Sequence, residues 1–157
     1  MLGRLLEGRG GPRSGLIGST VRINEIFHSI QGESTHAGRP CVFVRVTGCA
    51  LRCVWCDTTY AYHEGTDIPL ADVLAKVLAY RCRLVEVTGG EPLESPEVPE
   101  LVRLLLENGC EVLIETGGHK DISVLDPRSK PILATAKASG SRARRVPKPM
   151  MRPGLTR

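Results

Sequence analysis

The fold is decided by the stretch Cys41-Val-Phe-Val-Arg-Val46 and by two later runs that repeat its pattern. These runs are Leu84-Val-Glu-Val87 and Val112-Leu-Ile-Glu115. Short, mostly apolar runs rich in β-branched residues and bounded by glycine are typical of buried strands. A polar, glycine-containing loop follows each run. If the strands are parallel, these three loops share one edge of the sheet, which is the edge that carries the chemistry in α/β folds.

Between these runs, apolar residues recur at the spacing of an amphipathic helix. Positions i, i+3, i+4, i+7 and i+8 are apolar when counted from Leu70 and again from Val98, so we predict two helices. Ser95 is expected to cap the second helix, with Pro96 at its first position and Gly109 just past its end. The alternation predicts an α/β fold with flanking helices and a parallel sheet buried on both faces.

Outside this central unit, the patterns are weaker. Residues 21–27 alternate like a short strand, and residues 131–135 suggest a fourth strand of the series. Residues 1–20 are rich in glycine and arginine, so we expect a flexible extension before a core over residues 21–137. Residues 138–157 form a basic, proline-rich tail without periodicity, which we expect to be disordered.

Composition narrows the class of protein. The chain has 157 residues, 41% of them apolar and 24% charged, as expected of one globular domain. No apolar run approaches the roughly 18 residues that a membrane-spanning helix needs. The first residues lack the apolar centre of a secretory signal. We therefore expect a cytoplasmic protein with no membrane partner.

Charge is divided unevenly along the chain. Residues 21–127 hold 9 basic and 16 acidic side chains, a net charge of −7. Residues 128–157 hold 9 basic side chains and no acidic one. An acidic body does not suit a phosphate backbone, so we expect no nucleic-acid partner.

Three of the six cysteines, Cys49, Cys53 and Cys56, fall within one short loop. Without a secretory signal, this spacing favours a metal or redox site over a disulfide framework. A structural zinc site needs four ligands, and His63 would be the fourth in a zinc-stabilised binding module. A [4Fe–4S] cluster held by three cysteines would instead keep one iron open for a ligand. We expect core packing for Cys41, Cys82 and Cys110, and loop or surface positions for His28, His36, His63 and His119.

The cysteine loop carries a family resemblance. Its C-x3-C-x2-C spacing after a strand, with Trp55 before the last cysteine, resembles the signature of the radical S-adenosylmethionine (SAM) superfamily. Thr88-Gly-Gly-Glu-Pro92 resembles the GGEP motif of the same superfamily. In that superfamily, SAM chelates the open iron, and one-electron cleavage of its sulfonium yields a 5′-deoxyadenosyl radical. The resemblance implies the [4Fe–4S] cluster and SAM as cofactors.

A narrower resemblance covers about residues 21–137. Glu25-Ile-Phe27, Ile30-Gln-Gly-Glu33, Phe43-Val-Arg45 and Cys56-Asp-Thr58 follow the order and spacing of the 7-carboxy-7-deazaguanine synthase family. This resemblance implies a partial (β/α) barrel of the radical SAM type. The barrel would be incomplete at its C-terminus, because the later strands of the family have no counterpart here.

The resemblance assigns roles to individual residues of the matching motifs. A planar guanidinium suits the substrate carboxylate, and a hydroxyl suits Mg²⁺. The implied residues are Cys49, Cys53 and Cys56 for the cluster; Trp55, Cys56, Asp57 and Gly90 for SAM; Ile30, Gln31, Gly32, Glu33, Arg45, Thr88 and Glu115 for the substrate; and Thr58 for Mg²⁺.

The implied reaction is the Mg²⁺-dependent ring contraction of 6-carboxy-5,6,7,8-tetrahydropterin to 7-carboxy-7-deazaguanine, with loss of ammonia, in queuosine and 7-deazapurine biosynthesis. An electron donor such as flavodoxin or ferredoxin and a homodimer are implied as well. The alternative of a glycyl-radical-enzyme activase shares the cysteine spacing and the GGEP-like loop. An activase would act on a protein and should lack Arg45, the Gln-Gly-Glu loop and the Asp57–Thr58 pair.

The chain departs from the family near its C-terminus. The segment Ala134-Thr-Ala-Lys-Ala-Ser-Gly140 stands where the family has a loop containing an acidic residue and a proline. Beyond it nothing matches, and every charged residue is basic. We hypothesise a frameshift or a truncated gene model near residues 127–140, which DNA sequencing would test.

Overall fold

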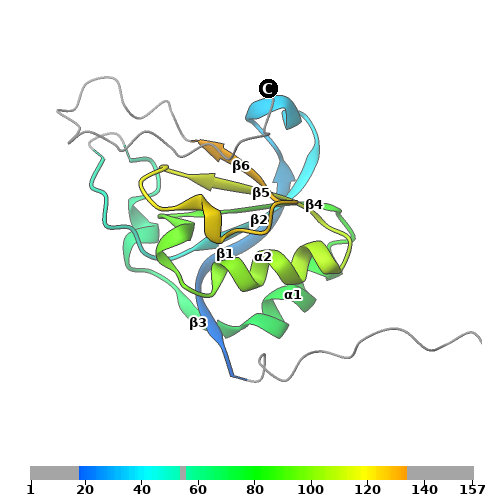
Figure 1. Cartoon of the computed structure of the whole chain (residues 1–157), viewed down its shortest axis with the longest axis horizontal. Coiled ribbons are helices and arrows are strands. Elements are labelled where there is room, and N and C mark those ends of the chain that lie inside the picture. The colour runs from blue at the N-terminus through cyan, green and yellow to red at the C-terminus, as the bar shows by residue number, and fades with distance from the viewer. Residues whose placement is uncertain (1–17, 54–55, 134–157) are drawn as a thin grey trace, which may run out of the picture.

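The computed structural model describes residues 18–53 and 56–133, which form a six-stranded sheet with helices on one face (Figure 1). Four single-turn 3-10 helices lie in the connections, at Ser34–His36, Thr59–Tyr62, Pro92–Glu94 and Ile122–Val124. The strands and longer helices are, in chain order, β1 (Thr20–Ile30), β2 (Pro40–Val46), β3 (Thr66–Pro69), α1 (Leu70–Ala79), β4 (Leu84–Gly89), α2 (Val98–Glu107), β5 (Glu111–Thr116) and β6 (Lys130–Leu133).

The sheet is mixed, in the order β3-β1-β2-β4-β5-β6. Strands β2, β4, β5 and β6 are parallel, which confirms the α/β core predicted from the apolar runs. Strand β1 is antiparallel to both of its neighbours, so the expectation of a wholly parallel sheet is corrected. A short connection joins β1 to β2, and such a connection can only form an antiparallel hairpin.

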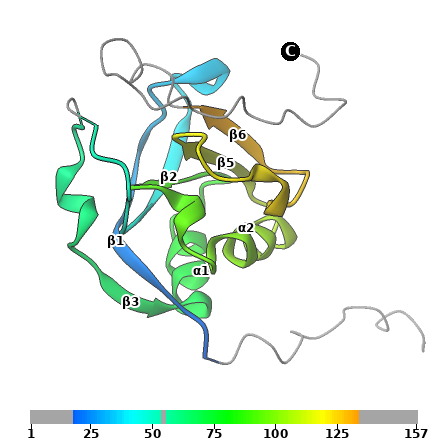
Figure 2. The same cartoon turned by 60° about the vertical axis from the view of Figure 1, so that its left-hand side comes forward.

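The two strands outside the parallel core differ most from expectation. Strand β1 runs from Thr20 to Ile30, further than the predicted 21–27. Strand β3 was not predicted, because its four residues show no apolar alternation. It forms by pairing with the first residues of β1, where Thr20 faces Pro69 (Figure 2). Of the predicted fourth parallel strand, residues 131–133 lie in β6, and residues 134–135 lie outside the described residues.

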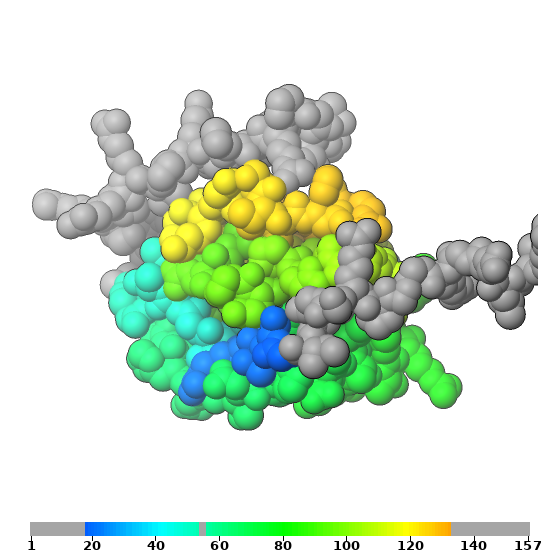
Figure 3. All heavy atoms as spheres, turned by 60° about the horizontal axis from the view of Figure 1, so that its bottom comes forward, coloured from blue at the N-terminus to red at the C-terminus, as the bar shows by residue number. Residues whose placement is uncertain are grey.

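Helices α1 and α2 pack on the same face of the sheet (Figure 1). Crossovers between parallel strands are nearly always right-handed, so strands added in one direction place their helices on one side. Viewed toward the helices, the yellow-to-orange segment after β5 lies against α2 (Figure 3). We call the side of the sheet that α1 and α2 cover the helix face. Its strand side chains are almost fully buried valine and isoleucine: Val42, Val44, Val46, Val85, Val87, Val112 and Ile114.

The start of α2 differs from the prediction. The helix begins at Val98, not at Pro96, and Pro99 occupies its first turn. Ser95 has an extended backbone, and its hydroxyl donates to the Glu97 carboxylate rather than capping the helix. Gly109 lies just past the helix end with φ +81°, a conformation suited to glycine, as predicted.

The other face of the sheet carries alternating residues of the same strands, and we call it the polar face. Phe27 and Phe43 stack there with ring centroids 5.0 Å apart. A small apolar cluster of Cys41, Leu84 and Leu113 lies toward the start of the parallel strands. Cys41 and Cys110 are buried and Cys82 is partly buried, as expected of core packing.

The prediction of burial on both faces holds for β4, whose residues Leu84 to Thr88 are all buried. Among the described elements, however, only the helix face is covered by helices. None of the helices formed by residues 18–53 and 56–133 is long and apolar enough to cross a membrane.

Candidate radical-chemistry site at the sheet edge

The three glycine-containing loops meet at the C-terminal edge of the parallel strands, as the strand pattern predicts. The N–H of Gly90 donates to the Val46 carbonyl at 3.2 Å, and the N–H of Glu91 donates to the Gly48 carbonyl at 2.8 Å. A Cβ added at Gly90 would lie 2.1 Å from the Gly48 oxygen. Glycine is therefore required where the loop after β4 touches the loop after β2.

A buried carboxylate ties the third loop to the second. Glu91 is 1% exposed. It accepts hydrogen bonds from the Thr116 hydroxyl and the Gly117 N–H, both at 2.8 Å, and from the Leu93 N–H at 3.1 Å. Three donors around one buried carboxylate offset the cost of burying it and hold the ends of β4 and β5 together.

His119 joins all three loops. Its Nε2 lies 3.0 Å from Glu94 Oε1, while Glu94 Oε2 accepts the Ala50 N–H at 2.8 Å. Its Nδ1 is buried without a hydrogen-bond partner, 3.4 Å from Glu91 Oε2. The sequence indicated only a loop or surface histidine. Its link to the cysteine loop depends on residues far apart in the chain, and no spacing rule reveals it.

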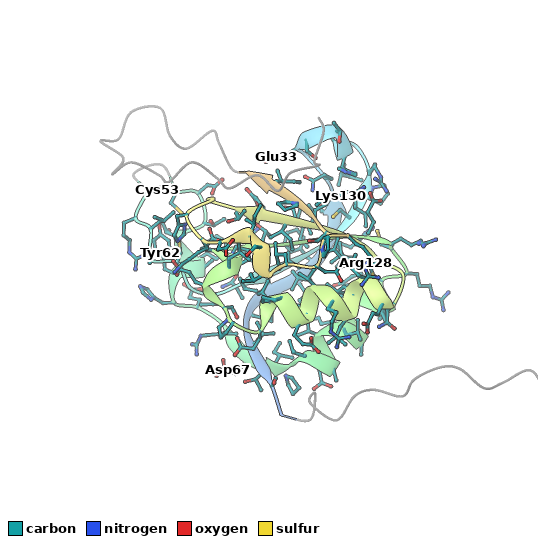
Figure 4. All side chains as sticks on the ribbon, viewed as in Figure 1. Glu33, Cys53, Tyr62, Asp67, Arg128 and Lys130 are labelled. Atoms are coloured by element: carbon teal, nitrogen blue, oxygen red, sulfur yellow. The ribbon has the colours of Figure 1, made fainter. Side chains whose placement is uncertain are left out.

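The cysteine loop offers three thiols and no disulfide. Cys49, Cys53 and Cys56 form no disulfide bond and are partly exposed. Burial raises the pKa of Cys49. A hydrogen bond to Cys56 raises the pKa of Tyr62 to about 12, and the Arg52 guanidinium lies 4.4 Å from the Tyr62 ring centroid. Cys53 and Tyr62 lie on the same side of the molecule, away from Glu33 (Figure 4).

The donor set of this loop fits an iron–sulfur cluster better than a zinc ion. Three soft thiolate ligands with no fourth cysteine leave one iron open. Within residues 18–53 and 56–133, no three His, Cys, Asp or Glu side chains stand close enough together to hold a metal ion. The three thiols would therefore have to converge on binding, as metal ligands commonly do. His63, the expected fourth zinc ligand, is exposed.

The residues predicted to bind SAM and Mg²⁺ lie in or next to the cysteine loop, as far as the structure describes them. Gly90 packs against Gly48 and Cys49. Asp57 is exposed, and Thr58 Oγ1 lies 3.8 Å from Cys56 Sγ. Trp55 lies outside the described residues. The roles of these residues stay predictions.

Three of the expected substrate residues lie side by side on the polar face, near the loop edge. Arg45 on β2 faces Thr88 on β4 in the register, and the Thr88 hydroxyl donates to Glu115 Oε2 at 2.6 Å. Arg45 is not a free surface residue, because its Nε donates to Glu25 Oε1 at 2.7 Å. Its guanidinium also lies 5.8 Å from the Tyr60 ring centroid. Glu25 and Tyr60 were not assigned to the site from sequence.

The Gln-Gly-Glu loop is divided between the surface and the sheet. Ile30, Gly32 and Glu33 are exposed, whereas Gln31 is 2% exposed. The side-chain amide of Gln31 donates to the carboxylate of Glu86 on β4. Sequence reasoning also missed Glu86, although an acidic residue inside an apolar strand was a signal for it.

Residues 43–128 match the family model described as the Radical SAM superfamily. The chain is 46% identical over 113 residues to a 7-carboxy-7-deazaguanine synthase of Chlorobaculum tepidum, covering 72% of this chain and 51% of that protein. It is 47% identical over 96 residues to the Thermoplasma acidophilum protein of the same name, covering 61% and 46%.

A solved structure agrees with the sequence relatives. The structure described as QueE from Escherichia coli superposes with a TM-score of 0.67 at 29% identity, covering 73% of this chain and 60% of that one. The chain spans about half the length of the curated relatives it matches.

Proposed function

Since the chain belongs to the radical SAM superfamily, we propose that it performs the reaction of its relatives, which are named 7-carboxy-7-deazaguanine synthases. The reaction is the Mg²⁺-dependent conversion of 6-carboxy-5,6,7,8-tetrahydropterin to 7-carboxy-7-deazaguanine, with release of ammonia, in queuosine and 7-deazapurine biosynthesis. The observation that carries this proposal is the position of Arg45, Thr88 and Glu115 on one face, beside the loop that holds Cys49.

Cys49, Cys53 and Cys56 would hold the [4Fe–4S] cluster. When bound, the cluster and SAM together supply one-electron chemistry, namely cleavage of the SAM sulfonium and abstraction of a hydrogen atom from the substrate. The protein's part is to fix the loop, which it does through the Ala50 N–H to the Glu94 carboxylate and through Gly90 against Gly48. Gly90, Asp57 and Trp55 would line the SAM site.

The polar face would bind the substrate. A guanidinium has five N–H donors, and the contact of Arg45 with Glu25 uses Nε, so the terminal nitrogens suit the substrate carboxylate. Glu115 would accept hydrogen bonds from the N–H groups of the pterin ring, with Thr88 holding its second oxygen. Phe43 and Leu113 lie on the same face, two residues before Arg45 and Glu115 on their strands, and would add apolar contacts to the bound substrate.

Further parts of the proposal rest on the chemistry of the reaction. Thr58 would contribute a hydroxyl to Mg²⁺, supported by its position beside Cys56. An electron donor such as flavodoxin or ferredoxin would supply the electron that SAM cleavage consumes. A cytoplasmic location suits an oxygen-sensitive cluster. The homodimer stays a prediction.

Anaerobic reconstitution of the full chain tests the proposal. We expect a brown protein with about four irons per chain. With SAM, a reductant, Mg²⁺ and the carboxypterin, it should form 7-carboxy-7-deazaguanine, detected by mass spectrometry. Cys53→Ser should abolish cluster and product together. Cys110→Ser, which changes a cysteine remote from the loop, should retain both.

The alternatives give different outcomes in the same experiment. One zinc and no iron would support the zinc-stabilised binding module and overturn the proposal. A cluster that cleaves SAM but leaves the carboxypterin unchanged would argue against the synthase function. It would favour the alternative hypothesis of a glycyl-radical-enzyme activase. Removal of Mg²⁺ with a chelator should slow product formation without changing the iron content.

A further inference from the structure

Glu86 is a buried acidic residue that the proposed reaction does not use. It lies in the middle of β4, is 4% exposed, and points onto the polar face. Its neighbours in the register are Phe43 on β2 and Leu113 on β5, both apolar. For stability alone, an apolar residue would be favoured at this position, because an apolar side chain avoids the cost of burying a carboxyl group.

The partner of Glu86 is Gln31, which joins two distant parts of the chain. The Gln31 side chain donates through Nε2 to Glu86 Oε2 and accepts the Glu33 N–H through Oε1 at 3.0 Å. Its main chain closes the β1–β2 hairpin, with the Gln31 N–H donating to the Arg39 carbonyl at 2.8 Å. Both ends of the buried amide are thus occupied, and the loop is attached to the centre of the sheet.

The surroundings of Glu86 raise its pKa to about 7, and burial is the largest cause. The hydrogen bond from Gln31 acts in the opposite direction and lowers the pKa. The carboxylates of Glu115 on β5 and Glu33 on the loop add to the rise, and Arg45 on β2 opposes them. The Cys41 thiol also faces it, with a pKa raised to about 12, chiefly by burial. Either form of Glu86 retains an oxygen that can accept from Gln31.

We propose that Glu86 is a positioning residue for the pterin substrate: it fixes Gln31, and through Gln31 the segment 30–33, at the edge of the polar face where the pterin ring binds. This inference rests on the proposed function. Glu86 acts through Gln31 and the Glu33 N–H rather than on the reacting atoms. Glu86 lies two residues before Thr88 on the same face of β4, so the loop bonded to it lies on the side of the sheet that carries the proposed substrate residues.

The test compares three variants of the full chain. Glu86→Leu removes the acceptor while keeping a buried side chain of similar size. Glu86→Gln restores the acceptor without a titratable group. Glu107→Leu changes an exposed glutamate on α2 and serves as the control. Hydrogen–deuterium exchange of residues 30–33 and the dissociation constant of the carboxypterin are measured for each, together with kcat and KM.

We expect Glu86→Leu to raise the exchange of the Glu33 amide and the dissociation constant of the carboxypterin about tenfold each, as loss of one buried hydrogen bond predicts. KM should rise with little change in kcat. Glu86→Gln and Glu107→Leu should stay near the wild type. A folded Glu86→Leu protein with unchanged loop exchange or unchanged pterin affinity would overturn the inference, as would failure of Glu86→Gln to rescue affinity. Loop exchange and pterin binding need no turnover, so they separate this result from a failure of the proposed function.

Discussion

The two faces of the sheet are built from the same strands but from different kinds of side chain. On the helix face, Val44 and Val87 are fully buried against α1 and α2. One residue further along, Arg45 and Thr88 face the opposite side and make polar contacts. Because successive side chains of a strand point to opposite faces, a single run of residues encodes both surfaces.

Stability and function are therefore assigned to different faces of the sheet in this molecule. The helix face is continuous apolar packing, which supplies most of the free energy of folding. The polar face holds a row of hydrogen-bonded groups, Glu25, Arg45, Thr88 and Glu115, in register beside the cysteine loop. Substitutions on the helix face should chiefly change the free energy of unfolding, and substitutions of Arg45, Thr88 or Glu115 on the polar face should chiefly change binding.

The largest expected effect comes from adjacent residues on opposite faces. Val44→Asp places an unpaired carboxylate among apolar side chains and should cost on the order of 5 kcal/mol, enough to unfold many domains. Arg45→Leu, which breaks a partly exposed ion pair with Glu25, should cost about 1 kcal/mol while weakening substrate binding. Urea unfolding followed by circular dichroism measures both. Equal costs would contradict the distinction between the faces.

The second effect is a pH dependence that arises on the polar face. The pKa of Glu86 is raised from 4.5 to about 7 in the folded chain, so the stability contributed by its protonated form is present below pH 4.5 and is lost as the pH rises toward 7. The loss should be on the order of 3 kcal/mol. Denaturation of wild type and Glu86→Gln at several pH values between about 4.5 and 8 isolates it.

An oppositely directed pH effect occupies a different window. Hydrogen bonds from Arg39 and Lys130 lower the pKa of Glu111 to about 2, so the stability that its charged form contributes is present above pH 4.5 and is lost as the pH falls toward 2.

The experiment on Glu86 also has an outcome that contradicts the description. A stability difference between wild type and Glu86→Gln that failed to grow between pH 4.5 and 7 would show that Glu86 is not buried as described.

A third, smaller effect concerns the loop edge where the faces meet. His119→Ala removes the partner of Glu94, which holds the Ala50 N–H of the cysteine loop. We expect a loss of about 1 kcal/mol in unfolding free energy and faster loss of iron from the reconstituted protein. His119→Gln, which retains an N–H donor, is the matched control. Identical iron retention in wild type and His119→Ala would show that His119 does not help to hold the cysteine loop.

The smallest expected effect comes from an exposed ion-pair network that lies on neither face of the sheet, and it serves as a reference for the others. Arg103 on the solvent side of α2 forms ion pairs with Glu100 and Glu107, both at 2.5 Å. Exposed pairs of this kind are worth little, so Arg103→Ala should cost about 0.5 kcal/mol at low salt and less at high salt. A larger, salt-independent loss in urea unfolding would indicate packing by the arginine stem.

The parallel core could be predicted because each of its elements has a clear period. Helix α1 covers the predicted stripe that begins at Leu70, and strands β2, β4 and β5 contain the three predicted runs. The meeting of the three loops at one edge followed from parallel geometry. By contrast, β3 and the direction of β1 depend on pairing between strands, which no local pattern records.

The candidate site could be predicted only where a motif marks it. The resemblance named Arg45, Thr88 and Glu115, and the structure brings these three together. It did not name His119 or Glu86, whose partners lie 25 and 55 residues away in the chain. Such contacts arise from the tertiary fold. The sequence marks Glu86 as an acidic residue in an apolar strand, and it carries no comparable mark for His119.

The close packing of Gly90 on Gly48 has a consequence for motion. The Glu91 N–H bonds to the Gly48 carbonyl, and a methyl group at either Gly89 or Gly90 would overlap the backbone beside it. A shift of either loop therefore disturbs the hydrogen bonds that join it to the other. Chemical exchange in the segment that carries Cys49 should therefore appear at the same rate in residues 89–91, as though both belonged to a single rigid part.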